Sequence, residues 1–217
     1  MHRSIDIVDI DIDEEMWYSM TPSGISKSHA RRFGSKPCIL LDSFTGIGGD
    51  LLHLDSNVFA IGCEINQERI LVAKSLHSQL SSSRADFVLS DSHNGNSCFR
   101  PKSFDLIYLS PPWGYLGVRP RRISPVFGNR KLALLELDGS LVFHRARQLV
   151  KNDRIAFYLP RGMDLWELAE LARETGSPND LTVDVHASYD PDDQVVKDKY
   201  KVRALTAYFG FSREILS

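Results

Sequence analysis

Three cysteines are all that the 217-residue sequence contains, and no two of them form a Cys-x-x-Cys pair. Cys38, Cys63 and Cys98 are too few and too far apart for a disulfide framework or a zinc site, and their pattern suits a reducing compartment. The seven histidines show no metal-ligand spacing either. We therefore expect no metal cofactor.

Long apolar runs are also missing. No stretch approaches the ~20 residues that a membrane-spanning helix needs, so no membrane contact is expected. Residues 1–15 contain six acids and one arginine, and they lack the apolar centre of a signal peptide. We expect a flexible acidic segment over residues 1–15, followed by a single domain over residues 16–217 in a soluble, intracellular and monomeric protein.

Neither sign of charge is in large excess. The chain has 26 Lys and Arg against 28 Asp and Glu, a net charge of −2, which excludes a uniformly basic protein of the histone type. The charge is uneven, however, because residues 119–154 contain nine basic and three acidic residues. One basic region in a mildly acidic chain suits an anionic ligand at one place, although a solvated helix face gives the same pattern.

The sequence does contain a regular alternation of short apolar runs and amphipathic stretches. The runs are β-rich and end near Gly, Pro or Asp, which favours strands, while the stretches between them have helical periodicity. This alternation predicts an α/β fold with a doubly wound, mostly parallel sheet of seven strands and helices on both faces. The last two strands have no helix between them and predict an antiparallel hairpin. The predicted strands are residues 38–41, 58–63, 87–89, 106–109, 155–159, 181–186 and 205–209, and the predicted helices are 23–33 (with Thr21 as its N-cap), 67–79, 139–151 and 164–175.

A glycine-rich block follows the first predicted strand. Asp42 precedes Gly46, Gly48 and Gly49, and such glycines let the backbone come close to a cofactor. The block departs from Gly-x-Gly-x-x-Gly at its last position, Leu51. An acid ahead of the glycines suits an ammonium group better than a pyrophosphate. This favours S-adenosylmethionine as the cofactor. The alternative is NAD, and the protein would then be an oxidoreductase.

Two more acids end the next two predicted strands. Glu64 lies 22 residues after Asp42, where a carboxylate can accept both ribose hydroxyls. Asp91 follows the third strand and is placed for an adenine amine. Three acids in this order at one edge of the sheet strengthen the prediction of S-adenosylmethionine.

A second block, Ser110-Pro111-Pro112-Trp113, follows an apolar strand. Two prolines cannot continue a central ladder, so the chain must form a stiff loop at the carboxyl edge of the sheet. Such a loop suits the methylation of a planar exocyclic amine, whose lone pair is delocalised into the ring. Hydrogen bonds from the amine to Ser110 Oγ and the Pro111 carbonyl localise this pair, and Trp113 fixes the line of attack. The alternative is a Pro-Pro turn with a core tryptophan.

With serine first and tryptophan last, this loop resembles that of the trimethylguanosine synthase family, which methylates N2 of the 7-methylguanosine cap of small RNAs. The resemblance covers residues 16–211. Two departures stand out: Tyr115 and Leu116 follow where the family usually has Gly-Pro, and Glu64-Ile65-Asn66 replaces Asp-Ile-Asp. The segments that carry the resemblance are residues 17–22, 42–49, 64, 109–114, 158–161 and 205–210.

The resemblance implies a class I Rossmann-like methyltransferase that makes 2,7-dimethyl- or 2,2,7-trimethylguanosine on small nuclear or nucleolar RNAs, in the nucleus or the cytoplasm. Trp113 would stack on the cap base beside Tyr115, and Arg161, with Pro160 and Arg119, would lie near the cap phosphates. The cofactor would contact Thr21, Pro22, Asp42, Phe44, Thr45, Gly46, Gly48, Glu64, Ile65, Asp91, Ser92 and Ser110.

Two other functions remain open at this point. An amino-methyltransferase that acts on adenine or guanine within rRNA, tRNA or DNA would share the Pro-Pro-aromatic loop but would not require a cationic base. A cap-binding module would keep the fold without catalysis. The presence of Asp42, Glu64, Ser110 and Trp113 argues against the second.

Overall fold

The computed structural model describes residues 14–92, 98–112, 133–134, 137–175, 178–189 and 200–211. The chain divides into two compact units, Met1–Arg100 and Pro101–Ser217, and each is described by itself. Trp113, Tyr115 and Arg119 lie outside the described residues, as does most of the acidic segment 1–15.

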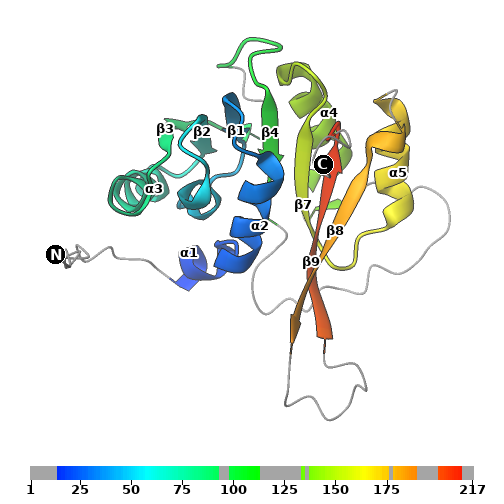
Figure 1. The fold of residues 1–217 in the computed structure, drawn as a ribbon, viewed down its shortest axis with the longest axis horizontal. Coiled ribbons are helices and arrows are strands. Elements are labelled where there is room, and N and C mark those ends of the chain that lie inside the picture. Colours follow the sequence, from blue (N-terminus) through cyan, green and yellow to red (C-terminus); the bar gives the residue numbers. More distant parts are fainter. Residues whose placement is uncertain are drawn as a thin grey trace. The chain divides into compact units, whose positions relative to one another are not determined.

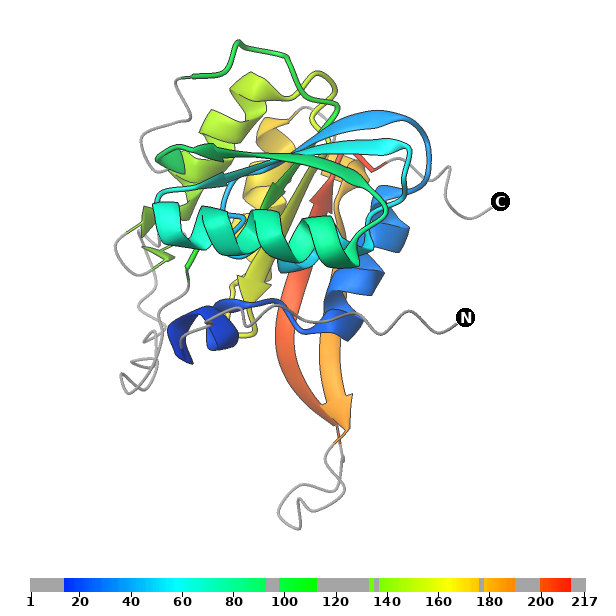
Figure 2. The same cartoon turned by 90° about the vertical axis from the view of Figure 1, so that its left-hand side faces the viewer.

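The first unit is built on three parallel strands in the order β3-β2-β1. Their carboxyl ends meet at one edge, since Asp42 pairs with Gly62 and Glu64 with Leu89. Helix α3 connects β2 to β3 and packs against both (Figures 1 and 2). The elements are α1 (Glu14–Ser19), α2 (Ser23–Phe33), β1 (Cys38–Asp42), the 3-10 helix η1 (Gly49–His53), β2 (Val58–Glu64), α3 (Gln67–Leu80) and β3 (Arg84–Leu89).

Helix α2 spans Ser23–Phe33 as predicted, but a different residue precedes it as the N-cap. Pro22, not Thr21, occupies the N-cap, and its carbonyl accepts hydrogen bonds from the N–H groups of Ile25 and Ser26. The N-cap prediction for Thr21 was therefore wrong. Proline fits this position because its fixed φ of −54° is compatible with helix entry, so the helix starts without a side-chain cap.

The second unit contains the other four long strands. β4 and β7 are parallel, β9 runs antiparallel to β7, and β8 runs antiparallel to β9, so the predicted hairpin of the last two strands is confirmed (Figure 1). The elements are β4 (Leu106–Leu109), the short strands β5 (Ala133–Leu134) and β6 (Leu137–Asp138), α4 (Gly139–Leu149), β7 (Ile155–Pro160), α5 (Leu165–Glu174), the 3-10 helix η3 (Pro178–Asp180), β8 (Thr182–Tyr189) and β9 (Tyr200–Phe209).

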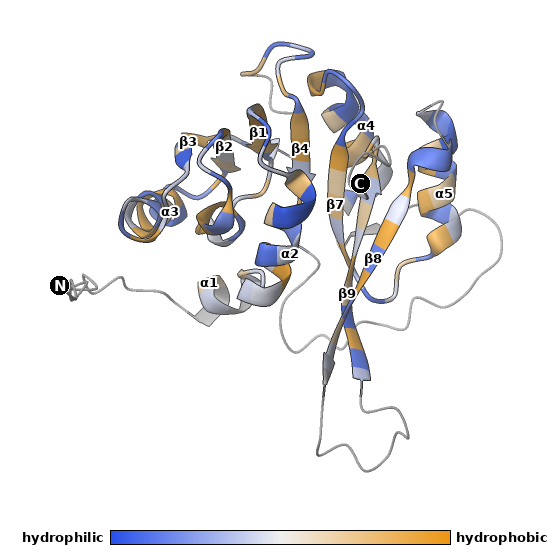
Figure 3. Ribbon diagram, in the orientation of Figure 1, coloured by the Kyte–Doolittle hydropathy of each residue, from blue (hydrophilic) through white to orange (hydrophobic). Residues whose placement is uncertain are grey.

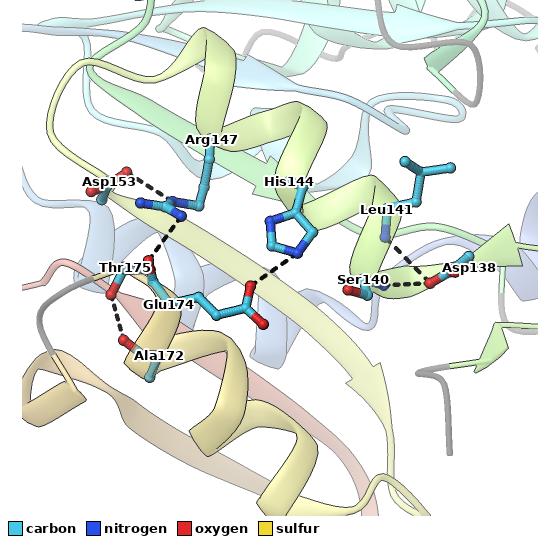
Figure 4. Close-up of polar contacts among 9 residues, drawn as sticks. All are labelled: Asp138, Ser140, Leu141, His144, Arg147, Asp153, Ala172, Glu174 and Thr175. Atoms are coloured by element: carbon cyan, nitrogen blue, oxygen red, sulfur yellow. Dashed lines mark hydrogen bonds and ion pairs between the residues drawn. The ribbon is translucent and has the colours of Figure 1, made fainter. Parts of the chain in front are cut away.

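Polar contacts join α4 to α5 within the second unit (Figure 4). His144 on α4 lies 3.1 Å from Glu174, the last residue of α5. Arg147 pairs with Asp153 at 3.2 Å and donates to the Glu174 carbonyl at 3.1 Å. The start of α4 is capped by Asp138, whose Oδ1 accepts from two backbone N–H groups of the first turn. These contacts hold together the helices that precede and follow β7 along the chain.

The central strands consist mainly of apolar residues, as the orange colour of β4 and β7 shows in Figure 3. All four residues of β4 are buried, and so are the first five of β7. Uninterrupted burial is typical of parallel strands that are covered on both sides. All seven predicted strands are present, and β9 runs antiparallel to both of its neighbours in the sheet, β7 and β8. The predicted α/β fold with a mostly parallel, seven-stranded sheet is confirmed.

Candidate active site

Asp42 is the last residue of β1, and its side chain is 1% exposed. Burial, followed by the charge of Asp50 and then that of Glu64, raises the pKa of this carboxyl group to about 8. The Phe44 N–H donates a hydrogen bond to Asp42 Oδ1 at 3.3 Å, which lowers this pKa and so opposes the shift. A buried carboxyl group beside two other acids favours the approach of a cation.

The glycine-rich loop opens beside Asp42. Thr45 is fixed by its N–H, which donates to the Cys63 carbonyl at 2.8 Å, and its own carbonyl accepts from Gly48 at 2.7 Å. Gly46 has a φ of +53°, and a Cβ atom there would meet nothing within 4 Å. The Gly46 backbone therefore faces open space, which suits the close approach of a ligand.

The Thr45 side chain has an unusual environment. Its hydroxyl lies close enough to Asp42 to lower the pKa of that carboxyl group, but the geometry falls short of a hydrogen bond. Among the described residues, Oγ1 is therefore a buried hydroxyl without a hydrogen-bond partner. Such groups are rare in folded proteins because an unmade buried hydrogen bond destabilises the fold. A ligand held over the loop would satisfy it.

Glu64 ends β2 and is 8% exposed. Its Oε1 accepts from the N–H groups of Ile65 and Asn66 at 3.0 and 2.9 Å, which orients the carboxylate. Oε2 receives no hydrogen bond from the described part of the chain, so it can accept from a ligand. Ile65, whose side chain is 60% exposed, presents an apolar surface directly beside it.

Asp91 and Ser92 follow β3. The Ser90 N–H donates to the Glu64 carbonyl at 2.9 Å and ties the end of β3 to that of β2. Asp91 is half-buried and Ser92 is buried. The structure thus brings Asp42, Glu64 and Asp91 to the carboxyl ends of three neighbouring parallel strands, as the sequence predicted.

The segment before α2 lies against the exit of this loop. A Cβ atom built on Gly49 would come within 2.7 Å of Met20 Cγ, so the Met20 side chain lies directly against the Gly49 backbone. Thr21 is buried and Pro22 exposed. On α2, His29 forms a buried contact with Asp50, which the sequence analysis missed. The two residues are 21 positions apart, and nothing in the spacing signals the pair.

The second unit contains those residues predicted to bind the methyl-accepting substrate that the structure describes. Ser110 is half-buried, Pro111 buried and Pro112 exposed, directly after β4. Pro160 ends β7 and the exposed Arg161 follows it. Because Leu109 pairs with Phe157 in parallel register, both segments leave the same edge of the β4–β7 pair. The positions of Trp113, Tyr115 and Arg119 remain predictions.

The donor set fits S-adenosylmethionine better than a metal ion. A buried carboxylate, a carboxylate with one unused oxygen, an unpartnered hydroxyl and an open glycine backbone suit a ligand with an ammonium group and a ribose. Clusters of three or more His, Cys, Asp or Glu side chains that could hold a metal are absent from the described residues. Over the same residues, no helix is both long and apolar enough to cross a membrane.

Known structures with the same fold were found across most of the chain. A SAM-dependent methyltransferase from Aquifex aeolicus has a TM-score of 0.54 at 12% identity, covering 89% of this chain and 96% of that one. A structure from Methanobacterium thermoautotrophicum described as precorrin 8w decarboxylase has a TM-score of 0.57 at 13% identity, covering 88% and 91%. Pyrococcus horikoshii NSun6, solved with the S-adenosylmethionine analogue SFG, has a TM-score of 0.54 at 15% identity, covering 86% and 52%. At these identities the likeness establishes the class I Rossmann-like fold.

Sequence comparison identifies the family. The trimethylguanosine synthase of Schizosaccharomyces pombe is 28% identical in an alignment of 172 positions that covers 73% of this chain and 66% of that protein, just under two thirds of its length. The model of the RNA cap guanine-N2 methyltransferase family matches residues 38–211. The predicted cofactor, S-adenosyl-L-methionine, is confirmed by this match together with the fold. The chain belongs to the RNA cap guanine-N2 methyltransferase family.

Proposed function

We propose that the protein transfers a methyl group from S-adenosylmethionine to the exocyclic N2 of 7-methylguanosine in RNA caps. The substrates are capped small RNAs of the nuclear or nucleolar type, and the products are 2,7-dimethyl- and 2,2,7-trimethylguanosine. The observation that carries the proposal is the Ser110-Pro111-Pro112 loop at the end of the buried strand β4, within a family match over residues 38–211. The relative's name supports a place in nuclear RNA processing.

The residues at the carboxyl ends of β1–β3 hold the cofactor, which supplies an activated methyl group. The Asp42 carboxylate binds the ammonium group, and the unused oxygen of Glu64 accepts from the ribose. Asp91 accepts from the adenine amine, with Ile65 and Ser92 beside it. The loop residues Phe44, Thr45, Gly46 and Gly48, the α2 entry Thr21 and Pro22, and Ser110 complete this proposed set.

Ser110 and Pro111 orient the amine that is methylated. An aromatic amine is a weak nucleophile because its lone pair is delocalised into the ring. The Ser110 hydroxyl and the Pro111 carbonyl accept hydrogen bonds from N2 and so direct the lone pair toward the methyl group. Buried Pro111 makes the loop rigid. No general base is required, because the amine becomes acidic once alkylated and releases its proton to water.

Trp113 selects the methylated cap. N7-methylguanine is a cation, and a tryptophan face binds a stacked cation with a gain of about 1–2 kcal/mol or more when desolvated. Guanine lacks this gain. Tyr115 flanks the base, while Arg161, with Pro160 and Arg119, binds the triphosphate bridge through charge-assisted hydrogen bonds. Arg161 is exposed at the end of β7, as a phosphate ligand requires.

We further propose that residues 16–217 act as one methyltransferase domain and as a monomer. The family match supports the single domain, because it extends over both compact units.

The test is the product mass after incubation of the protein with S-adenosylmethionine and either m7GTP or GTP. We expect one or two methyl groups on m7GTP and none on GTP. Trp113→Ala should weaken m7GTP binding by roughly tenfold or more, as loss of the cation–π contact requires, with cofactor binding unchanged. Trp166→Ala is the matched control, since this tryptophan on α5 is 72% exposed and has no proposed role.

Modification of GTP as fast as m7GTP would contradict cap selection. Cofactor binding without modification of either nucleotide would overturn the proposal and favour the alternative, an amino-methyltransferase that acts within structured RNA or DNA. A screen of rRNA, tRNA and DNA fragments would then identify the substrate.

A further inference from the structure

Three polar side chains on one face of α2 contact the segment that follows the glycine-rich loop. They are spaced three residues apart, so they lie along one side of the helix. Their partners are all in η1, the first element after the loop. The contacts are Ser23 Oγ with His53 Nε2 at 3.2 Å, Ser26 Oγ with the Gly49 carbonyl at 3.2 Å, and His29 Nδ1 with Asp50 Oδ1 at 2.9 Å.

The His29–Asp50 pair is the buried member of this set. His29 is 0% exposed and Asp50 is 7% exposed. A carboxylate only accepts hydrogen bonds, so Nδ1 of His29 carries a proton and donates it. The imidazole also stacks on Phe33, with ring centroids 6.1 Å apart. A buried ionic group is weak evidence for stability, because well-packed apolar residues often serve as well. A role in the adjoining site is a better explanation.

Two features connect the pair to the cofactor site. First, it joins α2 to η1, whose first residue, Gly49, lies against the Met20 side chain just before Thr21 and Pro22. Second, the Asp50 carboxylate faces Asp42 and raises the pKa of that group. The other groups that face Asp42 are Glu64 from β2 and Thr45 and the Phe44 N–H from the loop. Burial first, and then Cys98 and Asp42, raise the pKa of Cys63 on β2.

We propose that His29, acting through Asp50, is a positioning residue of the S-adenosylmethionine site. It holds α2 against η1, at the exit of the glycine-rich loop, and keeps the Asp50 carboxylate at a fixed place near Asp42. The inference depends on the cofactor and not on which RNA is methylated. A measurement of cofactor binding alone therefore tests it separately from the proposed cap activity.

The test compares His29→Leu, Asp50→Ala and Asp50→Asn by calorimetric titration with S-adenosylmethionine from pH 6 to pH 9. His29→Leu and Asp50→Ala break the contact and should weaken binding by about tenfold, the scale of a lost charge-assisted hydrogen bond. Asp50→Asn keeps an oxygen that accepts from His29 but removes the charge. It should retain binding at high pH, and the midpoint of its pH dependence should move to lower pH than in the wild type.

His77→Leu is the matched control. His77, on α3, is another buried histidine of the first unit, 7% exposed, and its Nε2 contacts Ser83 Oγ at 3.1 Å. This variant should lose stability but bind the cofactor as the wild type does. Wild-type affinity in His29→Leu and Asp50→Ala would overturn the proposal, and so would an equal loss in His77→Leu. If His29→Leu fails to fold, an unchanged pH midpoint in Asp50→Asn would overturn it.

Discussion

In the protein without cofactor, the ionised form of Asp42 is unfavourable, because its carboxyl group is buried beside Asp50 and Glu64. The folded pKa of about 8 lies above the ordinary value of 3.8, so between these pH values the folded chain holds a proton that the unfolded chain has lost. Stability therefore falls as the pH rises from about 4 to about 8 and changes no further, from this group, at higher pH.

Asp42→Asn should remove this dependence. The free energy of unfolding should rise relative to the wild type, by on the order of 1–4 kcal/mol at pH 8.5 and by less at pH 5, while binding of S-adenosylmethionine is lost. Urea denaturation at the two pH values measures the first effect and calorimetric titration the second. Asp86→Asn, on the exposed face of β3, is the control. A variant less stable at pH 8.5 than the wild type would show that Asp42 stabilises the fold.

The same residue shows how far the sequence could predict the site. Asp42, Glu64 and Asp91 each end an apolar run, and the carboxyl ends of parallel strands share one edge, so the pattern alone placed them together. The contact of His29 with Asp50 could not be predicted in this way. It depends on how α2 docks on η1, and docking leaves no periodic signal in the sequence.

Among the elements, those with a buried face were predicted closely, because hydrophobic periodicity reports burial. The four predicted helices and seven predicted strands all exist, with their ends shifted by a few residues. β9 begins at Tyr200, five residues before the predicted residue 205. Tyr200 and Val202 are exposed and pair only with β8, and the exposed Arg203 lies at the register shift between the two strands, so this part lacks the apolar pattern of a core strand. The short α1 and the β5–β6 pair were missed.

The loop between β1 and η1 allows a prediction at the scale of elements. Gly48 has a φ of +81°, and a Cβ atom there would lie 3.3 Å from the Phe87 ring and 3.4 Å from Ala73. Gly48→Ala should lower the free energy of unfolding by about 1–3 kcal/mol, since it combines left-handed strain with crowding. Chemical denaturation would measure this loss.

Gly24 is the matched control within α2, because a Cβ atom there meets nothing within 4 Å and the backbone is helical. Gly24→Ala should leave stability unchanged or raise it by up to about 1 kcal/mol. Equal effects of the two substitutions would mean that the loop adapts to a side chain at Gly48, and the argument for a rigid cofactor loop would fail.

At the scale of the whole molecule, the proposal of one domain over residues 16–217 predicts a single unfolding transition. The residues proposed to bind the cofactor lie mainly in the first unit, whereas the Ser110-Pro111-Pro112 loop, proposed to bind the amine that is methylated, lies in the second. If the two units fold as one, a ligand that binds at β1–β3 must stabilise both. At one hundred times its dissociation constant, the cofactor adds about 2.7 kcal/mol. For a chain of this length that corresponds to a rise in Tm of roughly 5–10 °C.

Differential scanning calorimetry with and without S-adenosylmethionine measures this directly. We expect one transition that moves as a whole, with a calorimetric enthalpy equal to the van't Hoff enthalpy. The rise in Tm should be larger at pH 8.5 than at pH 6.5, because Asp42, with a pKa of about 8, must lose its proton to bind the ammonium group. Two transitions, of which the cofactor moves only one, would mean that the compact units unfold independently. Methyl transfer from a cofactor bound by one unit to an amine bound by the other would then require ligands to bring the two units together.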